Sequence, residues 1–407
     1  MRIDRERLWR SLTDLAVIGA TPEGGCSRPA LTDGDAEAQL LFGRWAESSG
    51  CAVTRDAIGN LFAERAGAEP SLPPVVIGSH LDTQPDGGRF DGPVGVLGAL
   101  EIVRTLNDAG IVTSAPIMIA VWMNEEGARF PLPLTGSSVF AGLLEQGAAE
   151  AQAASDGPSF GEELRRLGLV GDQAVGSRAL DSYFELHIEQ GTILERSGVD
   201  VGIVERGQGV RALTVTITGV AAHAGTAAMT ERSDALVAAA SIVLAAQRIG
   251  VERSTLVTVG RLDVRPNSRA TVPGEVTLVV DIRDPEVTRI DAADHAIRGA
   301  IAEAAERGAV AARVEKTLEI PVVEFDRECR RLVASGCEAL GLSSVPLVSG
   351  AGHDAMSLAA VAPASLVFIP CRHGVSHHPA EYASPDQIGA GCDALLHAVV
   401  ERAGIVA

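Results

Sequence analysis

Residues 75–82 read Val-Val-Ile-Gly-Ser-His-Leu-Asp, a short apolar run that ends in polar side chains. Two further runs of this kind occur at 117–124 and 182–187. Uninterrupted apolar runs of this length are typical of strands that are buried on both faces of a mostly parallel sheet. We therefore predict an α/β fold whose reactive groups gather beyond the carboxyl ends of these strands.

The chain has 407 residues, more than one hydrophobic core usually supports, which predicts two domains. From residue 211 the pattern changes to the order βαββαβ, which is typical of a ferredoxin-like domain. The expected strands are 211–218, 255–264, 275–283 and 311–318, and the expected helices are 232–249 and 290–307. Parallel-sheet runs then return at 344–348 and 364–369. We therefore expect an α+β domain, residues 209–324, to be inserted into a larger domain made of residues 1–208 and 325–407.

The composition argues against several classes of partner. Thirty-four basic and 53 acidic residues give a formal charge of −19, which predicts that neither nucleic acid nor an anionic membrane is bound. The charged start lacks a secretion signal, and the longest uncharged apolar run, 235–246, is shorter than a membrane span. We therefore expect a cytoplasmic protein. The six cysteines include no Cys-x-x-Cys pair, which predicts reduced thiols and no thiolate metal site.

Imidazole and carboxylate side chains recur at the expected strand ends and on two loops. They are His80, Asp82, Asp91, Glu125, Glu126, His187, His377 and His378. Taken singly, each is more often a structural residue, such as a helix cap or a solvated loop acid. Together they supply the ligand types that zinc and similar divalent ions prefer. Two ions sharing Asp91 would need two histidines on one side and a glutamate with a histidine on the other, so we predict a binuclear metal site.

Seven sequence blocks resemble those of the hydantoinase/carbamoylase-type amidohydrolases. That family belongs to the M20 metallopeptidase superfamily, which also includes allantoate amidohydrolases and β-ureidopropionases. The blocks run in the family's order between residues 78 and 381. They are Gly78-Ser-His-Leu-Asp-Thr, Gly88-Arg-Phe-Asp-Gly-Pro-Val-Gly, Asn124-Glu-Glu-Gly-Ala-Arg-Phe, Glu185-Leu-His-Ile-Glu-Gln-Gly, His223-Ala-Gly-Thr, Ser349-Gly-Ala-Gly-His-Asp-Ala and Ser376-His-His-Pro-Ala-Glu.

The resemblance implies a role for each candidate. One metal ion would be held by His80, Asp91 and His187, and the other by Asp91, Glu126 and His377. In the family pattern the ligand directly follows serine, which selects His377 over His378. Glu125 would be the general base, and Asp82 would orient the imidazole of His80. The metal is expected to be zinc, or else manganese, cobalt or nickel.

The resemblance also implies that the inserted domain is a lid through which the protein forms a homodimer. His223 would stabilise the oxyanion, and it would reach the active site together with Asn267 across the dimer interface. Arg283 would bind a substrate carboxylate, although an ion pair with a neighbouring aspartate is the alternative. Gln190 and His353 would be further substrate contacts.

The expected reaction is hydrolysis of an N-carbamoyl-L-amino acid to the L-amino acid, carbon dioxide and ammonia. Allantoate or another ureido acid is the alternative substrate. A dipeptidase or aminoacylase is less favoured, because His187 stands where peptide-cleaving relatives supply an acid; a metal-free binding protein is the remaining alternative. Two departures from the family pattern bear on the substrate: Val210 replaces a common glutamine, and Ala227-Ala228 replaces Thr-Pro.

Overall fold

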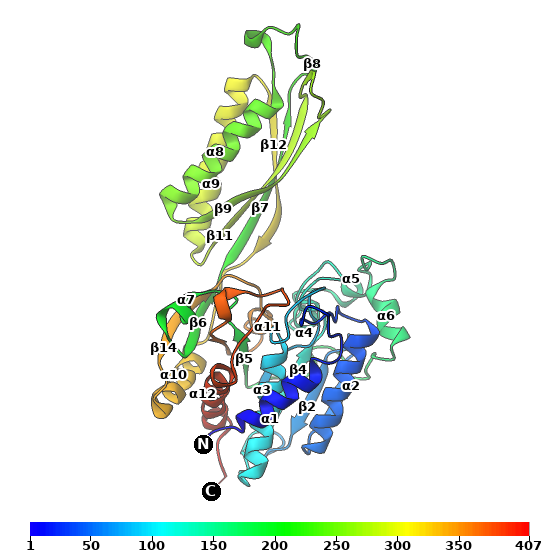
Figure 1. Cartoon of the computed structure of the whole chain (residues 1–407), viewed down its shortest axis with the longest axis vertical. Helices are drawn as coiled ribbons and strands as arrows, with labels where there is room; N and C mark the ends of the chain where they lie inside the picture. Colours follow the sequence, from blue (N-terminus) through cyan, green and yellow to red (C-terminus); the bar gives the residue numbers. More distant parts are fainter. Residues whose placement is uncertain (407) are drawn as a thin grey trace. The chain divides into compact units, whose positions relative to one another are not determined.

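The computed structural model describes residues 1–406 and divides the chain into two compact units (Figure 1). The large unit comprises Met1–Glu205 and Glu324–Ala407, and the small unit is Arg206–Val323. The sequence-based expectation divided the chain at 208/209 and 324/325, and the two units divide it at 205/206 and 323/324. The predicted α/β class, with a largely parallel central sheet, is confirmed.

The large unit is built on a nine-stranded sheet with the order β1-β2-β4-β3-β5-β15-β6-β13, and β14 pairs with β6. The strands are β1 Ala52–Arg55, β2 Leu61–Arg65, β3 Val75–His80, β4 Ile117–Trp122, β5 Ser182–Ile188, β6 Val201–Gly207, β13 Val323–Glu324, β14 Ser344–Ser349 and β15 Ala364–Ile369. The four central strands β4, β3, β5 and β15 run parallel. Every residue of these four strands is buried, which explains their uninterrupted apolar sequences.

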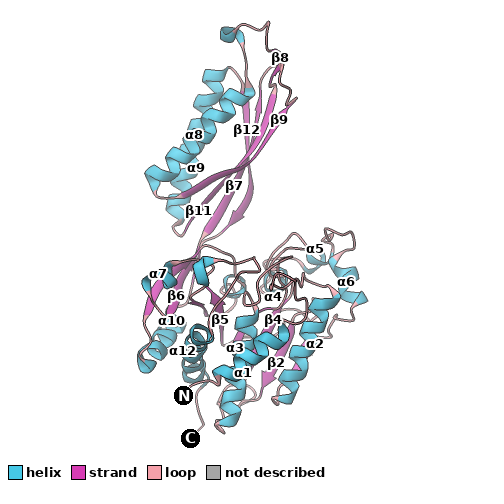
Figure 2. Cartoon of the chain, in the orientation of Figure 1, coloured by secondary structure: helices cyan, strands magenta, loops and turns pink. Residues whose placement is uncertain are grey.

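Helices pack around this sheet (Figure 2). They are α1 Arg5–Leu15, α2 Asp33–Ser48, α3 Pro93–Asp108, α4 Thr135–Phe140, α5 Gln146–Glu150, α6 Phe160–Arg166, α7 Ile193–Ser197, α10 Arg327–Leu340, α11 Asp354–Leu358, α12 Pro385–Ala403 and the 3-10 turn Arg372–Gly374. Proline occupies the first position of α3 and of α12, where no intrahelical donor is needed. Both helices are buried along most of their length, because they lie between the sheet and other helices.

The small unit is a four-stranded antiparallel sheet with two helices on one face (Figure 2). Its elements are β7 Gly209–Thr218, β8 Ala222–His223, the 3-10 turn Met229–Glu231, α8 Ala235–Arg253, β9 Leu256–Arg265, β10 Thr271–Val272, β11 Glu275–Asp284, α9 Val287–Gly308 and β12 Ala311–Ile320. The sheet order is β12-β7-β11-β9, which leaves β9 at an edge. Alternate residues of β11 are buried and form the core with the helices, so the intervening residues face the open side of the sheet.

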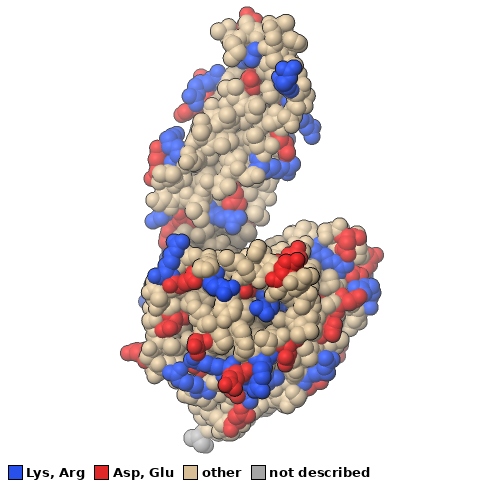
Figure 3. All heavy atoms as spheres, in the orientation of Figure 1, with Lys and Arg blue, Asp and Glu red and all other residues tan. Residues whose placement is uncertain are grey.

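Within the described residues, α8 is the one helix long and apolar enough to cross a membrane by length and composition. Its alanine-rich face is buried in the core of the small unit, which includes Ala239 and Ile242. Packing therefore explains this buried face, whereas Leu244 and Val251 of the same helix are exposed. Charged side chains of both signs are interspersed on the face drawn in Figure 3.

The parallel direction of β4, β3, β5 and β15 decides where polar groups meet. The carboxyl ends of these strands lie at one edge of the sheet, and the segments that follow them contain the predicted site residues. The segment that follows β3, residues 81–83, is hydrogen-bonded to Arg28, whose side chain is buried in the large unit. Its guanidinium donates to the backbone oxygens of Leu81 and Ile18, and its backbone exchanges hydrogen bonds with Thr83.

We predict that Arg28→Met lowers the stability of the large unit by on the order of 3 kcal/mol, because buried carbonyl oxygens lose their donors. The thermal midpoint should fall by about 5 °C or more. Tryptophan fluorescence measures this change, since Trp9, Trp45 and Trp122 all lie in the large unit. The exposed Arg44 of α2 provides the control Arg44→Met, which should leave the midpoint unchanged. Equal midpoints for the two variants would contradict this account of Arg28.

Candidate metal centre

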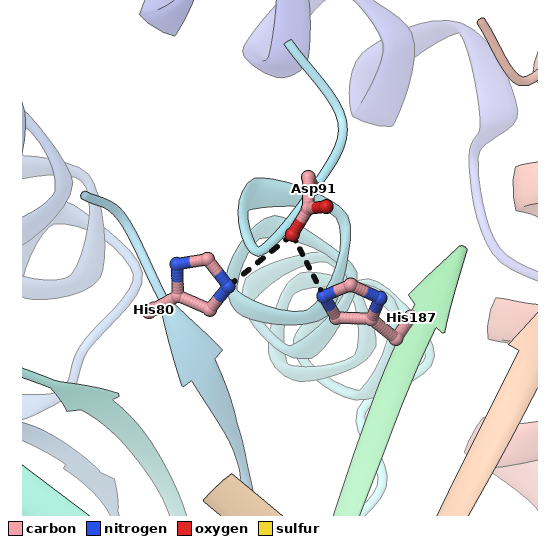
Figure 4. Close-up of side chains that lie close together, drawn as sticks. All are labelled: His80, Asp91 and His187. Carbon is pink, nitrogen blue, oxygen red and sulfur yellow. Dashed lines mark ion pairs between the residues drawn. The ribbon is translucent and has the colours of Figure 1, made fainter. Parts of the chain in front are cut away.

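Three buried side chains converge at the carboxyl edge of the sheet (Figure 4). His80 ends β3, His187 lies at the end of β5, and Asp91 lies on the turn before α3. The Oδ1 atom of Asp91 is 3.4 Å from Nε2 of His80 and 3.1 Å from Nε2 of His187. Gly92 makes this approach possible: it has a φ of +81°, and a Cβ there would lie 2.5 Å from the His80 ring.

The hydrogen bonds of the two imidazoles fix which nitrogen faces Asp91. Nδ1 of His80 lies 2.8 Å from the backbone oxygen of Asp82, and Nδ1 of His187 lies 2.9 Å from that of Ile188. A carbonyl oxygen only accepts, so each Nδ1 carries the proton in the neutral ring and each Nε2 presents a lone pair. Both Nε2 atoms are buried and make no hydrogen bond within the described chain. Two such nitrogens beside a carboxylate fit a divalent metal ion.

A second group shares Asp91. Nε2 of His377 lies 3.6 Å from Asp91 Oδ2 and 3.2 Å from Glu126 Oε2. The possible ligand atoms of this group all lie within 4.8 Å of one another, as do those of the first group. His377 is 46% exposed on its side chain, whereas Asp91 and Glu126 are buried, so this group opens to solvent on the histidine side. The two oxygens of Asp91 therefore face two different groups of ligand types.

Glu125 lies beside the first group and belongs to neither. Its Oε2 atom is 3.6 Å from His80 Nε2, and the residue is 8% exposed. Burial raises the pKa of Glu125 well above its ordinary value, and the His80 imidazole opposes this while Asp354 and Glu126 add to it. A buried carboxylate close to, but outside, two ligand groups is placed to exchange a proton with a group bound there.

The acids at this edge repel one another when no cation is present. Burial, followed by the charge of Asp91, raises the pKa of Glu126 to about 8. Burial also acts to raise the pKa of Asp91, but His187 and His80 outweigh it and hold that pKa well below the ordinary value. Like charges in low dielectric are costly unless cations or protons neutralise them. The donor set and its electrostatics thus both suit bound cations.

Asp82 contacts His80 differently from the sequence-based expectation. Its backbone oxygen accepts from the imidazole, and its carboxylate lies 3.8 Å from Nδ1. The carboxylate instead accepts hydrogen bonds from the backbone N–H groups of Glu125 and Glu126, at 3.2 and 3.3 Å. Asp82 therefore holds the two acids of the next strand in position, because it ties the end of β3 to the end of β4.

Gln190 and His353 also lie at this edge of the large unit. Nε2 of Gln190 donates to Asp91 Oδ2 at 2.6 Å, so this side chain already has a partner. The ring of His353 packs 4.4 Å from that of His187, between centroids, and neither of its nitrogens makes a hydrogen bond within the described chain. Burial, followed by the charge of His187, holds the pKa of His353 well below its ordinary value, so the ring is neutral.

The remaining predicted residues belong to the small unit. His223 lies in the short strand β8, exposed, and pairs with Thr271 of β10. Asn267 is exposed on the loop between β9 and β10. Arg283 lies on the open face of β11, where it donates to both carboxylate oxygens of Asp281 at 2.8 and 3.3 Å. The ion pair that the sequence offered as an alternative is thus present.

Sequence reasoning assigned no role to several buried polar residues at the same edge. Glu185 accepts from Ser79 and from the backbone of Ala355, and Glu381 contacts the turn that carries Asp91. Both glutamates stand within the sequence blocks quoted above. The sequence signal that could have identified them was therefore an acid in a block that also contains a predicted metal ligand. The local pattern does not reveal their partners, because those lie far away along the chain.

Peptidase family M20/M25/M40 matches residues 76–401 of the chain. The N-carbamoyl-L-amino-acid amidohydrolase of Rhizobium meliloti is 44% identical, over 100% of this chain and 98% of the relative. The ureidoglycolate hydrolase of Arabidopsis thaliana is 33% identical, over 97% of this chain and 86% of the relative.

Solved structures agree with the sequence comparison. A hydantoinase/carbamoylase family amidase from Burkholderia ambifaria matches with a TM-score of 0.92 and 48% identity, over 100% of this chain and 99% of that one. Both the sequence and the fold are therefore shared over the full length. The chain belongs to peptidase family M20/M25/M40 and, within it, to the hydantoinase/carbamoylase amidases.

Proposed function

We propose that the protein hydrolyses N-carbamoyl-L-amino acids to the L-amino acid, carbon dioxide and ammonia. The observation that carries this proposal is the pair of ligand groups sharing Asp91, with the unligated acid Glu125 beside them. The relatives named N-carbamoyl-L-amino-acid amidohydrolase, of which one is 44% identical along the whole chain, support this substrate over peptides.

In this proposal two divalent ions bind per chain. His80, Asp91 and His187 hold one, and Asp91, Glu126 and His377 hold the other. Zinc, manganese, cobalt and nickel all suit this mixture of imidazole and carboxylate ligands. When bound, the ions would supply Lewis acidity toward the ureido carbonyl group and lower the pKa of water. The backbone hydrogen bonds made by Nδ1 of His80 and of His187 orient the two rings so that each Nε2 faces Asp91.

Glu125 is the proposed general base. Its carboxylate accepts a proton from the attacking water and later passes it to the leaving nitrogen, a task that needs an acid outside the ligand set. Asp82 fixes the backbone of Glu125 and so fixes the approach of its carboxylate. His353 is a neutral, unpaired imidazole beside His187 that we propose as a substrate contact, and Gln190 is a second one.

The small unit contributes the remaining proposed groups. Arg283 binds the substrate carboxylate through the part of its guanidinium not engaged by Asp281, since an arginine fork can serve two carboxylates. His223 stabilises the developing oxyanion, and Asn267 adds a polar contact. Both residues are exposed within their own unit, as groups that act on another copy of the chain must be.

The strand register around Arg283 favours a substrate with an apolar side chain. Arg283 pairs with Val210 on one side and with Leu256 on the other, and Ile320 pairs with Val210. Cross-strand partners share a face, so the guanidinium lies in a row of aliphatic side chains. The α-carbon of a bound amino acid is one bond from its carboxylate, so its side chain would contact this row. Allantoate carries a second ureido group there, which the row cannot hydrogen-bond.

The first prediction concerns the general base. Glu125→Gln should lower kcat by at least about 100-fold while zinc stoichiometry is retained, because proton transfer is lost and the ligands are intact. Ammonia release from N-carbamoyl-L-leucine measures the rate, and metal analysis of the same sample measures the zinc. Treatment of the wild type with a chelator should abolish release, and added zinc should restore it. Full activity in Glu125→Gln, or in chelated protein, would refute the mechanism.

The second prediction concerns the substrate. Val210→Gln should lower the ratio of kcat/KM for N-carbamoyl-L-leucine to that for allantoate by roughly tenfold, because an amide replaces an aliphatic contact. Thr216→Gln is the control: Thr216 lies on the same face of β7 but pairs with Thr277, further along the sheet. An unchanged ratio in Val210→Gln would show that the substrate side chain lies elsewhere.

The third prediction concerns the oligomeric state. We propose a homodimer formed through α8 and the edge strand β9, which expose Leu244, Val251 and Leu256 at 69%, 75% and 60%. An edge strand with free backbone groups beside an apolar helix face is a ready surface for a second copy.

Sedimentation should give twice the chain mass of 42.1 kDa. Leu244→Glu with Val251→Glu should give monomers of reduced activity, whereas Val17→Glu, at an exposed site of the large unit, should not. An active wild-type monomer would contradict this proposal.

A further inference from the structure

The turn that contains Asp91 is hydrogen-bonded to a buried acid that lies near the end of the sequence. Glu381 is 2% exposed and follows β15 in the block that begins at Ser376. Its Oε1 atom accepts from the backbone N–H groups of Phe90 and Asp91, at 2.8 and 3.0 Å. One carboxylate oxygen thus fixes two successive peptide groups, and the second of these belongs to the shared residue Asp91.

Ser376 connects the same two acids through their side chains. Its Oγ atom lies 2.6 Å from Asp91 Oδ2 and 3.1 Å from Glu381 Oε2. A hydroxyl has one proton, so Ser376 donates to one of the two carboxylates at a time. Gln190 also donates to Asp91 Oδ2 and is 3.3 Å from Ser376 Oγ. Glu381 therefore contacts Asp91 through the backbone and through a bridging hydroxyl.

Gly88 leaves the space that Glu381 occupies. A Cβ at residue 88 would lie 2.0 Å from the carboxyl carbon and from Oε1 of Glu381, and its three nearest atoms all belong to Glu381. Gly88 does not have the positive φ that would by itself require glycine. The close approach of Glu381 therefore explains the glycine, so residues 88 and 381 form an interlocking pair.

The two backbone hydrogen bonds need an acceptor atom at residue 381, and they do not need a charge. The amide oxygen of glutamine could accept from the same two N–H groups, whereas alanine offers no acceptor. A side chain that fixes the backbone of a ligand residue in this way orients that ligand toward a bound ion.

We infer that Glu381 is a positioning residue for metal binding: it holds the 88–91 turn so that Asp91 presents one oxygen to each ligand group. This inference rests on the proposed metal-dependent function. Neither the resemblance nor the family match gives Glu381 this role. Ser376 and Gly88 complete the arrangement, the first by bridging the carboxylates and the second by leaving room for Glu381.

Affinity for zinc tests the inference without relying on activity. Chelator-stripped protein is titrated with zinc in competition with a chromogenic chelator, and its metal-free thermal midpoint is followed by tryptophan fluorescence. Glu381→Ala should bind zinc about 10–100-fold more weakly, because the 88–91 turn loses its acceptor for two backbone N–H groups. Glu381→Gln should stay within about threefold of the wild type, because its amide oxygen can accept from the same two groups. Rescue of zinc affinity by glutamine is the result expected of a positioning residue.

A matched control is available in the same unit. Asp393 on α12 is a fully buried carboxylate that accepts from the backbone N–H of Ile3 and from Arg5. Asp393→Asn should lower the midpoint and leave zinc affinity within about twofold of the wild type, since Asp393 lies outside the ligand groups. Unchanged zinc affinity in Glu381→Ala, or an equal loss of zinc affinity in Asp393→Asn, would overturn the inference.

A double-mutant cycle tests the interlocking pair. Gly88→Ala in the wild type should weaken zinc binding about as much as Glu381→Ala does, because the new methyl group displaces the carboxylate. In the Glu381→Ala background, Gly88→Ala should change the affinity by less than about twofold. Additive losses would show that the two residues act separately. A wild type that binds no zinc would instead refute the proposed function, so the two failures are distinguishable.

Discussion

The carboxylate of Asp91 is the contact on which the rest of the site depends. It lies between two buried imidazoles on one side and the pair Glu126 and His377 on the other, and each of its oxygens faces one group. A single side chain can hold this position only if its backbone is fixed. Two features provide that constraint: the positive φ of Gly92, and the hydrogen bond that the backbone N–H of Asp91 donates to Glu381. The turn before α3 is therefore as much a part of the centre as the ligands.

The parallel sheet supplies the remaining ligand types at the same place. Because β3, β4, β5 and β15 run in one direction, the residues that follow them meet at one edge, although they are scattered from residue 80 to residue 381. Asp82 ties two of these strand ends together, since its carboxylate accepts from the backbone of Glu125 and Glu126. The rigidity of buried strands is thus transmitted to side chains in loops.

Local sequence pattern predicted the parts of this arrangement that depend on local physics. The apolar runs ending at His80 and His187 indicated buried strands, and alternation from residue 275 indicated the half-exposed strand β11. The shared blocks pointed to imidazole and carboxylate residues that meet at one edge of the sheet. Pattern did not predict that Asp82 meets His80 through its backbone, nor that Glu381 accepts from Phe90, 291 positions away. Such contacts depend on tertiary packing, because residue type and spacing do not specify which distant backbone group a buried acid will accept from.

In the proposed metal centre, metal binding would be linked to stability. Several carboxylates are buried together, and burial with mutual repulsion raises the pKa of Glu125 and of Glu126. A chain selected for stability alone would replace such acids with neutral residues, as buried charges are costly without compensation. Their retention follows if cations bind, because binding free energy then stabilises the folded state in proportion to the repulsion it relieves. In the proposed centre, relief of this repulsion would thus contribute part of the driving force for metal binding.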